Sequence, residues 1–436
     1  MTRAAISARP WGRAAVWLLG LGPFFFMSYG AANWLATMHD NVGSVVFDWE
    51  RNIPFMPGTI IPYWSIDVLY GISLFVCTTE HELDTHAKRL LTAQIIAVTC
   101  FILFPLTFTF ARPETDGLSG FLFASLGKFD KPFNQAPSLH IALLVILWDR
   151  YARHVPLWAS WILHGWFVLI GLSVLTTYQH HFVDIPTGAL LGFVCLWAWP
   201  ENGPSPVVAN RLTGDPWRLR LATYYIAGSI AFCALAVWIG GLGLWLFWPG
   251  VSLLLVAANY ALCGAAGFQK SPSGRMSPAA LWMLAPYIGG AWINSRLWTR
   301  TEPLPVPVAD GVSVGRFPSR ATSSGYATVI DLCAELPGRG GGQTYLALPM
   351  LDLITPTAEQ LRRVVTEIET ARAAGPLLVC CALGYGRSAA AVAAWLLNSG
   401  RAENVEAASQ HIRRVRPHAV LRAGTRDAIA AAGIKS

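Results

Sequence analysis

Charge is what this sequence has least of. Only 13% of its 436 residues are Asp, Glu, Lys or Arg, whereas soluble globular domains average about 25%. Hydrophobic residues make up 54% of the chain, and 19 residues are tryptophan. A chain this apolar cannot stay solvated as a disordered polymer, and it is not composed like an ordinary soluble enzyme. The composition therefore predicts a membrane protein.

Cysteines are few, and none is placed to form a disulfide. Three of the eight, Cys333, Cys380 and Cys381, lie in the C-terminal region, and the others fall inside apolar stretches. We expect none of them to face an oxidising compartment, so no disulfide is predicted. The formal net charge of +7 fits the basic cytoplasmic loops of a membrane protein, and we expect no nucleic-acid partner.

Apolar stretches long enough to cross a bilayer recur along the first two thirds of the chain. They predict eight spans, at 13–36, 59–78, 90–110, 137–149, 157–176, 182–199, 221–240 and 243–264. Residues 277–300 are interrupted by Pro286, Gly289 and Gly290, which favours an interfacial or re-entrant segment, with a ninth span as the alternative. We therefore predict an all-α, multi-span membrane helix bundle over residues 1–276.

Lys and Arg in the connecting loops predict the orientation, because positive charge is retained on the cytoplasmic side. With the N-terminus inside, the outside segments hold only Arg51, Arg112, Lys128 and Lys131. The inside segments hold twelve: Arg3, Arg9, Arg13, Lys88, Arg89, Arg150, Arg153, Arg211, Arg218, Arg220, Lys270 and Arg275. The bias places the C-terminus in the cytoplasm.

A Pro-rich junction at 303–307 ends the segment 277–304 and marks a change of composition. Short β-rich runs follow at Thr328–Leu332, Leu346–Met350 and Leu377–Cys380, and they alternate with helical patterns at 357–373, 388–399 and 403–414. Alternating strands and helices are typical of α/β folds. Residues 305–436 are therefore expected to form a compact α/β domain with a central sheet.

One segment of this domain, residues 379–388, lies where a buried strand is expected to turn into a helix. Five residues separate Cys381 from Arg387, and Gly384 and Gly386 are among them. Such a loop lets successive backbone N–H groups converge on an oxyanion at a helix N-terminus. It favours the thiolate of the cysteine, and the arginine can clamp a phosphate with two hydrogen bonds.

This pattern resembles the cysteine-dependent protein tyrosine phosphatases, in particular their compact dual-specificity branch, over residues 305–436. Val314–Pro318 and Val329–Leu332 resemble the first core strands of that branch, and Leu348–Asp352 resembles the segment that carries its general acid. The resemblance implies these roles: Cys381 as nucleophile, Arg387, Gly384 and Gly386 as phosphate ligands, Ser388 as an aid to breakdown of the phosphocysteine, and Asp352 as general acid.

The C-terminal motif departs from the family at one position. The residue before the nucleophile is usually His, and here it is Cys380. A redox pair of Cys380 and Cys381 is an alternative interpretation. The loop between Cys381 and Arg387 carries no Lys, Arg or His, so a phosphotyrosine pocket and an open site for a lipid monophosphate both remain possible.

A second group of polar residues lies at two predicted span entrances on the outer side, where ionisable residues are costly and usually functional. The first is Pro137–His140, and the second runs from Thr176 to Asp184. His180 and Asp184 are four residues apart, so on a helix the carboxylate would orient the imidazole. A zinc site of His140, His180, His181 and Asp184 is the alternative.

The two outer segments resemble the type 2 phosphatidic acid phosphatase (PAP2) superfamily over residues 60–200, which leaves the spans within 221–264 as additions. The resemblance implies that His180 is a nucleophile oriented by Asp184, that His140 is the acid and base, and that Arg112 binds phosphate. Two family cations are replaced, by Pro105 and Val174. Lys128, Lys131 or Gln179 would have to substitute for them.

Together the two resemblances imply a bifunctional integral phosphatase of a bacterial inner membrane, with no cofactor and no metal. We expect phospholipid or isoprenoid phosphates of the bilayer as substrates, with phosphoproteins as further candidates at the cytoplasmic site. A lipid head-group phosphotransferase with an attached protein phosphatase is the alternative. A third hypothesis keeps one or both sites as phosphate-binding modules without catalysis.

Overall fold

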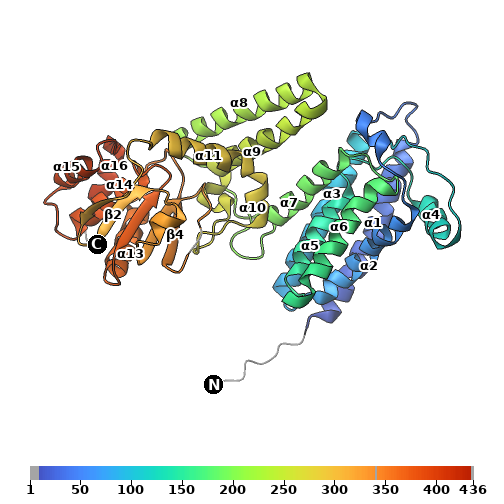
Figure 1. The fold of residues 1–436 in the computed structure, drawn as a ribbon, viewed down its shortest axis with the longest axis horizontal. Helices are drawn as coiled ribbons and strands as arrows, with labels where there is room; N and C mark the ends of the chain where they lie inside the picture. Colours follow the sequence, from blue (N-terminus) through green and yellow to red (C-terminus); the bar gives the residue numbers. More distant parts are fainter. Residues whose placement is uncertain (1–8, 339–340, 434–436) are drawn as a thin grey trace. The chain divides into compact units, whose positions relative to one another are not determined.

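The computed structural model describes residues 9–338 and 341–433. The chain divides into two compact units, 1–207 and 208–436. Arg3, one of the residues used to predict the orientation, lies outside the described part. Each unit is considered by itself below (Figure 1).

The first unit is all-helical. Its helices are α1 (Trp11–Ala36), α2 (Ile60–Val76), α3 (Glu80–Leu103), α4 (Gly117–Phe129), α5 (Leu139–Ala152), α6 (Ser160–Thr176) and α7 (Asp184–Ala198). The second unit begins with α8 (Pro216–Ile239) and α9 (Phe247–Ala258), which is extended by a π-turn and a 3-10 turn up to Phe268. The short helices α10 (Pro278–Met283) and α11 (Ala285–Trp298) follow.

Within the described residues, six helices are long and apolar enough to cross a membrane: α1, α2, α3, α6, α8 and α9, counted with their short extensions. The other two predicted spans are helices of 14 and 15 residues, α5 and α7. The third predicted span was misplaced, because α3 begins at Glu80 and ends at Leu103. The structure thus supports a membrane-spanning helical region, and the orientation stays a prediction.

Helix α3 begins ten residues before the predicted span, and its first turns contain charged residues. They are tolerated there because they are paired inside the first unit. Arg89 lies 3.1 Å from Asp149 and 3.4 Å from Glu201. Arg150, fully buried, contacts both Glu82 and Glu201. Buried charges are tolerated only when paired. A count of apolar residues along the sequence cannot register such pairing, which explains the error of ten residues at this helix.

Glycines set the packing of α5 against α7. A Cβ atom on Gly188 would lie 2.4 Å from the Ser138 carbonyl oxygen, and one on Gly192 would lie 2.7 Å from the Val145 side chain. Small residues let two helix backbones approach closely. This contact brings Ser138, at the start of α5, next to the loop that precedes α7.

The second unit ends in an α/β fold around a five-stranded sheet of order β1-β2-β5-β3-β4. The strands are β1 (Val306–Ala309), β2 (Val312–Arg316), β3 (Thr328–Cys333), β4 (Thr344–Met350) and β5 (Leu377–Cys381). Strands β1 and β2 pair antiparallel, and the pairs β2–β5, β5–β3 and β3–β4 are parallel. The helices are α12 (Arg320–Ser323), α13 (Ala358–Arg372), α14 (Arg387–Asn398), α15 (Val405–Val415) and α16 (Ala423–Gly433).

The three predicted strands and three predicted helices of this domain are all present, within two residues at each end. Strand β1 and helices α12 and α16 were not predicted. Strand β5 is central and buried along its whole length, as expected for a parallel strand covered on both faces. Its carboxyl end, Cys381, is followed by the loop that leads to α14.

A buried lysine fastens the segment after α9 to the sheet. Lys270 forms an ion pair with Asp331 of β3 and donates to the Cys333 carbonyl oxygen, and both charged side chains are fully buried. Tyr345 of β4 donates to the same carboxylate over 2.5 Å. Burial alone would lower the pKa of Lys270, but Asp331 raises it. The raised pKa keeps Lys270 charged across the neutral range.

Removing the lysine should leave an uncompensated buried carboxylate. We expect Lys270→Met to destabilise the protein by about 3–5 kcal/mol, measured as a lower midpoint of thermal unfolding of the full-length protein in detergent. The double variant Lys270→Met/Asp331→Asn should recover part of the loss, and Arg320→Met, at an exposed position, should change nothing. An equal loss in Lys270→Met and Arg320→Met would contradict this account.

Candidate active sites

The loop between β5 and α14 surrounds the Cys381 thiol. The Sγ atom of Cys381 accepts a hydrogen bond from the Gly384 backbone N–H over 3.3 Å and lies 3.3 Å from the Ser388 hydroxyl. Gly384 has φ +80°, and a Cβ atom there would lie 2.5 Å from the Gly315 backbone. Glycine is therefore required at this position by both conformation and space.

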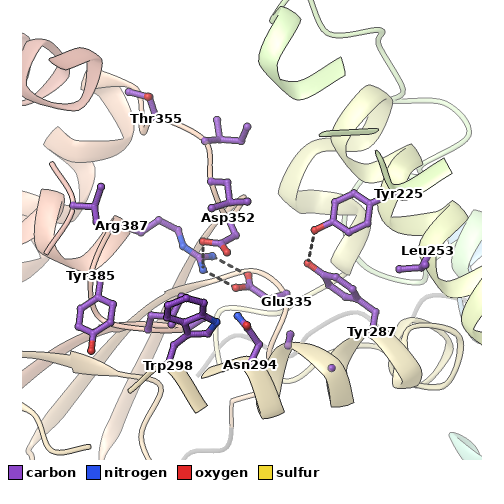
Figure 2. A pocket seen from close by; sticks show the side chains of 18 of the residues that line it. Tyr225, Leu253, Tyr287, Asn294, Trp298, Glu335, Asp352, Thr355, Tyr385 and Arg387 are labelled. Atoms are coloured by element: carbon purple, nitrogen blue, oxygen red, sulfur yellow. Dashed lines mark hydrogen bonds and ion pairs between the residues drawn. The ribbon is translucent and has the colours of Figure 1, made fainter. Parts of the chain in front are cut away.

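Arg387 begins α14, and its guanidinium is buried between two carboxylates. Its Nη1 and Nη2 atoms donate to the two oxygens of Glu335 over 2.8 and 2.6 Å. Nη2 also lies 2.9 Å from Asp352, and Nη1 donates to the Met350 carbonyl oxygen over 2.9 Å. Figure 2 shows the guanidinium between the two acids. The Arg387 side chain thus connects the carboxyl ends of β3 and β4 to the start of α14.

The Nε atom of Arg387 is left over. Among the residues that the structure describes, this buried nitrogen has no hydrogen-bond partner. A buried donor without a partner is costly, and guanidinium groups bind phosphate through pairs of parallel N–H groups. The Nε donor is therefore available to a phosphate oxygen, while Nη1 and Nη2 bind the neighbouring acids.

Charge and burial shift the acids around Arg387 in opposite directions. Burial alone would raise the pKa of Glu335, but the charge and hydrogen bonds of Arg387 lower it. Burial raises the pKa of Asp352 although Arg387 opposes this. Asp352 therefore keeps its proton to a higher pH than an ordinary aspartate, as a general acid requires.

The residues predicted for the C-terminal site lie in two sets of contacts at the β5–α14 loop. Cys381 contacts Gly384 and Ser388, and Arg387 contacts Asp352. Gly386 lies directly before α14 and lines the same cavity as Arg387 and Asp352. Cys380 points elsewhere: it is fully buried with Val329 and Leu378, and burial raises its pKa.

Glu335 is the residue of this site that the sequence analysis missed. It follows β3 by two residues, and β3 is a neighbour of β5 in the sheet. The carboxyl ends of adjacent parallel strands share one edge of a sheet. An acidic residue just after a predicted strand was therefore the available signal, but the strand order needed to use it was unknown.

In the first unit, His180 and Asp184 are in contact, but not on a helix as expected. His180 lies in the loop before α7, and its backbone N–H donates to the Val174 carbonyl oxygen over 3.1 Å. Its Nδ1 atom is 3.1 Å from Asp184 Oδ2, and its Nε2 atom is 3.2 Å from the Ser138 hydroxyl. The turn therefore achieves the orientation of the imidazole that we expected from helical spacing.

The predicted acid and base, His140, lies on α5 and stacks on Tyr63 with ring centroids 4.1 Å apart. Within the described part of the chain, its buried Nε2 atom has no hydrogen-bond partner. Ser138, rather than His140, contacts the Nε2 atom of His180. His181 binds Glu50, which is buried and was not predicted from the sequence.

A cavity of about 340 Å³ lies beside His180. Arg112, Lys131 and Gln179 line it, whereas Lys128 is on the exposed surface of α4. The lining also contains Asp130, which accepts a hydrogen bond from Tyr29 over 2.8 Å. Among the described residues, no cluster of three or more His, Cys, Asp or Glu could hold a metal ion.

Comparison with known proteins identifies the C-terminal part alone. Residues 321–432 match the family described as the catalytic domain of dual specificity phosphatases. No curated protein matches the chain significantly. The matches do not include a PAP2 family, so that resemblance rests on the motifs of the sequence.

Three solved structures illustrate the likeness. The active form of Tk-PTP is 26% identical to this chain, with a TM-score of 0.28, and the match covers 30% of this chain and 97% of the Tk-PTP chain. Human DUSP28 is 24% identical, with a TM-score of 0.27, and the match covers 29% of this chain and 90% of the DUSP28 chain. PTPMT1 in complex with PI(5)P is 20% identical, with a TM-score of 0.27, and covers 29% and 92%.

The buried pair of Glu335 and Arg387 should stabilise the protein. We expect Glu335→Gln to lower the free energy of unfolding at pH 7 by about 3 kcal/mol. Because the pKa of Glu335 is lowered in the folded state, its contribution is present above the ordinary pKa of a glutamate. It is lost as the pH falls through the lowered value.

Thermal unfolding of the full-length protein between pH 7 and pH 3 measures this difference. The gap between wild type and Glu335→Gln should close at the acid end. Glu359→Gln, at an exposed position in the first turn of α13, is the matched control. A gap of constant size at all pH values would show that the charge is not responsible.

Proposed function

Because residues 321–432 carry the catalytic domain of a dual specificity phosphatase, we propose that this site hydrolyses phosphomonoesters through a phosphocysteine on Cys381. The supporting observation is the arrangement of the β5–α14 loop. The Gly384 N–H donates to the Cys381 thiol, and the buried Nε atom of Arg387, at the end of the same loop, has no partner among the described residues. The substrate is a phosphomonoester of a lipid or a protein.

In the first step, the thiolate of Cys381 attacks phosphorus, an S–P bond forms and the P–O bond to the leaving group breaks. Asp352 gives its proton to the departing oxygen. Arg387 and the backbone N–H groups of Gly384 and Gly386 bind the phosphoryl oxygens. The N-terminus of α14 stabilises the negative charge that these oxygens carry.

In the second step, water attacks the phosphocysteine. Asp352 now takes a proton from the water, and the S–P bond breaks to release phosphate. The Ser388 hydroxyl, 3.3 Å from Sγ, donates to the departing sulfur. Cys381 returns as the thiolate.

The helical region supports a second candidate function, a phosphatase that works through a phosphohistidine on His180. The supporting observation is the His180–Asp184 contact beside a cavity that holds Arg112 and Lys131. An imidazole held by a carboxylate at Nδ1 presents Nε2 as a nucleophile. A phosphohistidine can pass its phosphoryl group to water or to an alcohol, so head-group transfer remains the alternative.

Neighbouring cysteines provide a test of the first function. Cys381→Ser should lower kcat/KM for para-nitrophenyl phosphate by more than about 10³-fold, because it removes the nucleophile. Cys380→Ala, at the adjacent buried position, should leave it within about threefold. Loss of activity in Cys380→Ala with retention in Cys381→Ser would overturn the assignment.

The second function is tested in the Cys381→Ser protein, which isolates the membrane site. Release of phosphate from a lipid phosphomonoester in nanodiscs should persist there and should fall by about 10³-fold when His180→Gln is added. His164→Gln, at an exposed histidine of α6, is the control. Adding an alcohol and analysing the lipids distinguishes transfer from hydrolysis. Activity that survives His180→Gln would exclude the phosphohistidine.

A further inference from the structure

A cavity of about 690 Å³ adjoins the C-terminal site, and it has two kinds of wall. One wall belongs to the phosphatase domain and contains Glu335, Asp352 and Arg387. The opposite wall comes from α8, α9 and α11, which lie outside the residues that match the phosphatase family. Figure 2 shows Tyr225, Leu253 and Tyr287 of these helices across the cavity from Arg387.

The cavity changes in polarity from one wall to the other. Arg387, with its vacant Nε donor, lies at the polar end. The helices contribute the apolar side chains Phe232, Pro249 and Leu253. The Tyr225 and Tyr287 hydroxyls, 3.5 Å apart, and the Asn294 side chain are polar groups of the lining that could bind a head group. An amphiphile with an anionic end matches this change from a polar to an apolar lining.

The apolar end runs along a helix that can cross a membrane. Tyr225 and Phe232 are seven residues apart on α8, which corresponds to about 10 Å of helix. Helix α8 has 24 residues and is apolar enough to span a bilayer. Its surface away from the cavity exposes further apolar residues, among them Ile230, Val237 and Trp238, as lipid contact requires.

Hydrogen bonds join the helices directly to the catalytic loops. Tyr260, after α9, donates to the Asp352 carbonyl oxygen over 3.0 Å, and Trp217 of α8 donates to that of Leu353 over 2.9 Å. Ser295 of α11 donates to the Ala382 carbonyl oxygen over 2.5 Å. The loop of the general acid and the loop of the nucleophile are thus both fixed by the helical segment.

We propose that the Cys381 site takes a phosphomonoester carried on an apolar chain that remains in the membrane. The phosphate binds at Arg387 and the chain lies between α8, α9 and α11. This inference rests on the proposed phosphatase function and names its substrate class. The rim carries the exposed apolar residues Trp298, Leu353 and Val420 beside the exposed Thr355 and Arg422. Apolar side chains with one cation at the edge favour a lipid with an anionic head group over a phosphopeptide.

Two pairs of neighbouring residues provide matched variants. Leu253 lines the cavity, whereas Leu254 is on the exposed surface. Gly290 lines it and Gly289 is outside the lining, and a Cβ atom on either would meet nothing within 4 Å. Leu253→Trp and Gly290→Phe should therefore narrow the cavity, and Leu254→Trp and Gly289→Phe add the same bulk elsewhere.

The variants are compared in the full-length His180→Gln protein, so that the other candidate site does not contribute. Three probes are used: para-nitrophenyl phosphate, a phosphotyrosine peptide, and nanodiscs that contain either phosphatidic acid or a phosphatidylinositol monophosphate. The lining variants should lower kcat/KM for at least one lipid by about tenfold or more. They should leave kcat/KM for para-nitrophenyl phosphate within about twofold of the His180→Gln protein. The outer variants, Leu254→Trp and Gly289→Phe, should change neither the lipid activity nor the activity on para-nitrophenyl phosphate.

Other outcomes separate the inference from the function on which it rests. Hydrolysis of para-nitrophenyl phosphate and the peptide, with no hydrolysis of either lipid, would overturn the inference and leave the phosphatase function standing. Lining variants that match the outer variants on the lipids would overturn it as well. A Cys381-dependent activity missing for every probe would overturn the phosphatase function itself.

Discussion

The buried guanidinium of Arg387 is the charge on which the C-terminal site depends. Such a group is stable inside a protein only when it is paired and hydrogen-bonded. Here Glu335 neutralises it with two hydrogen bonds, while Asp352 and the Met350 carbonyl oxygen hold the same nitrogens from the other side. The ends of β3 and β4 and the start of α14 are therefore fixed relative to one another by one side chain, and Nε remains for a ligand.

The same charge connects the chemistry to the helical segment that precedes the domain. Asp352 is on a loop whose two carbonyl oxygens accept hydrogen bonds from Trp217 and Tyr260. Leu353 in that loop has φ +59°, a conformation that a non-glycine residue adopts only at a cost. Contacts from α8 and from the turn after α9 therefore help to hold Asp352, the proposed general acid, in place. The spans within 221–264, which the sequence analysis could only treat as additions, thus contact the proposed active site.

Local patterns allowed much of this to be predicted from the sequence. Cys381, Gly384, Arg387 and Ser388 lie within eight residues, so their arrangement follows from one strand, one loop and one helix. The β-rich runs of the α/β domain were located because buried parallel strands are continuous in their hydrophobicity. The His180–Asp184 contact was predicted for a helix and is made by a turn, since four residues of separation allow both.

What could not be predicted depends on contacts between distant segments. Glu335 reaches Arg387 across 52 residues, and His181 reaches Glu50 across 131. Lys270 was counted as a loop cation, but it is a buried partner of Asp331. The start of α3 was missed because its charged residues are paired with residues on other helices. Each case requires knowledge of which elements are neighbours, and hydrophobic periodicity along one element does not contain it.

The most direct measurement is to trap the phosphoenzyme during turnover. Full-length protein in nanodiscs would be mixed with a lipid phosphomonoester labelled in its phosphate, quenched within one turnover, digested and analysed by mass spectrometry. We expect label on the peptide that contains Cys381 and none on it in Cys381→Ser. Phosphate released at the wild-type rate while that peptide stays unlabelled would contradict the account.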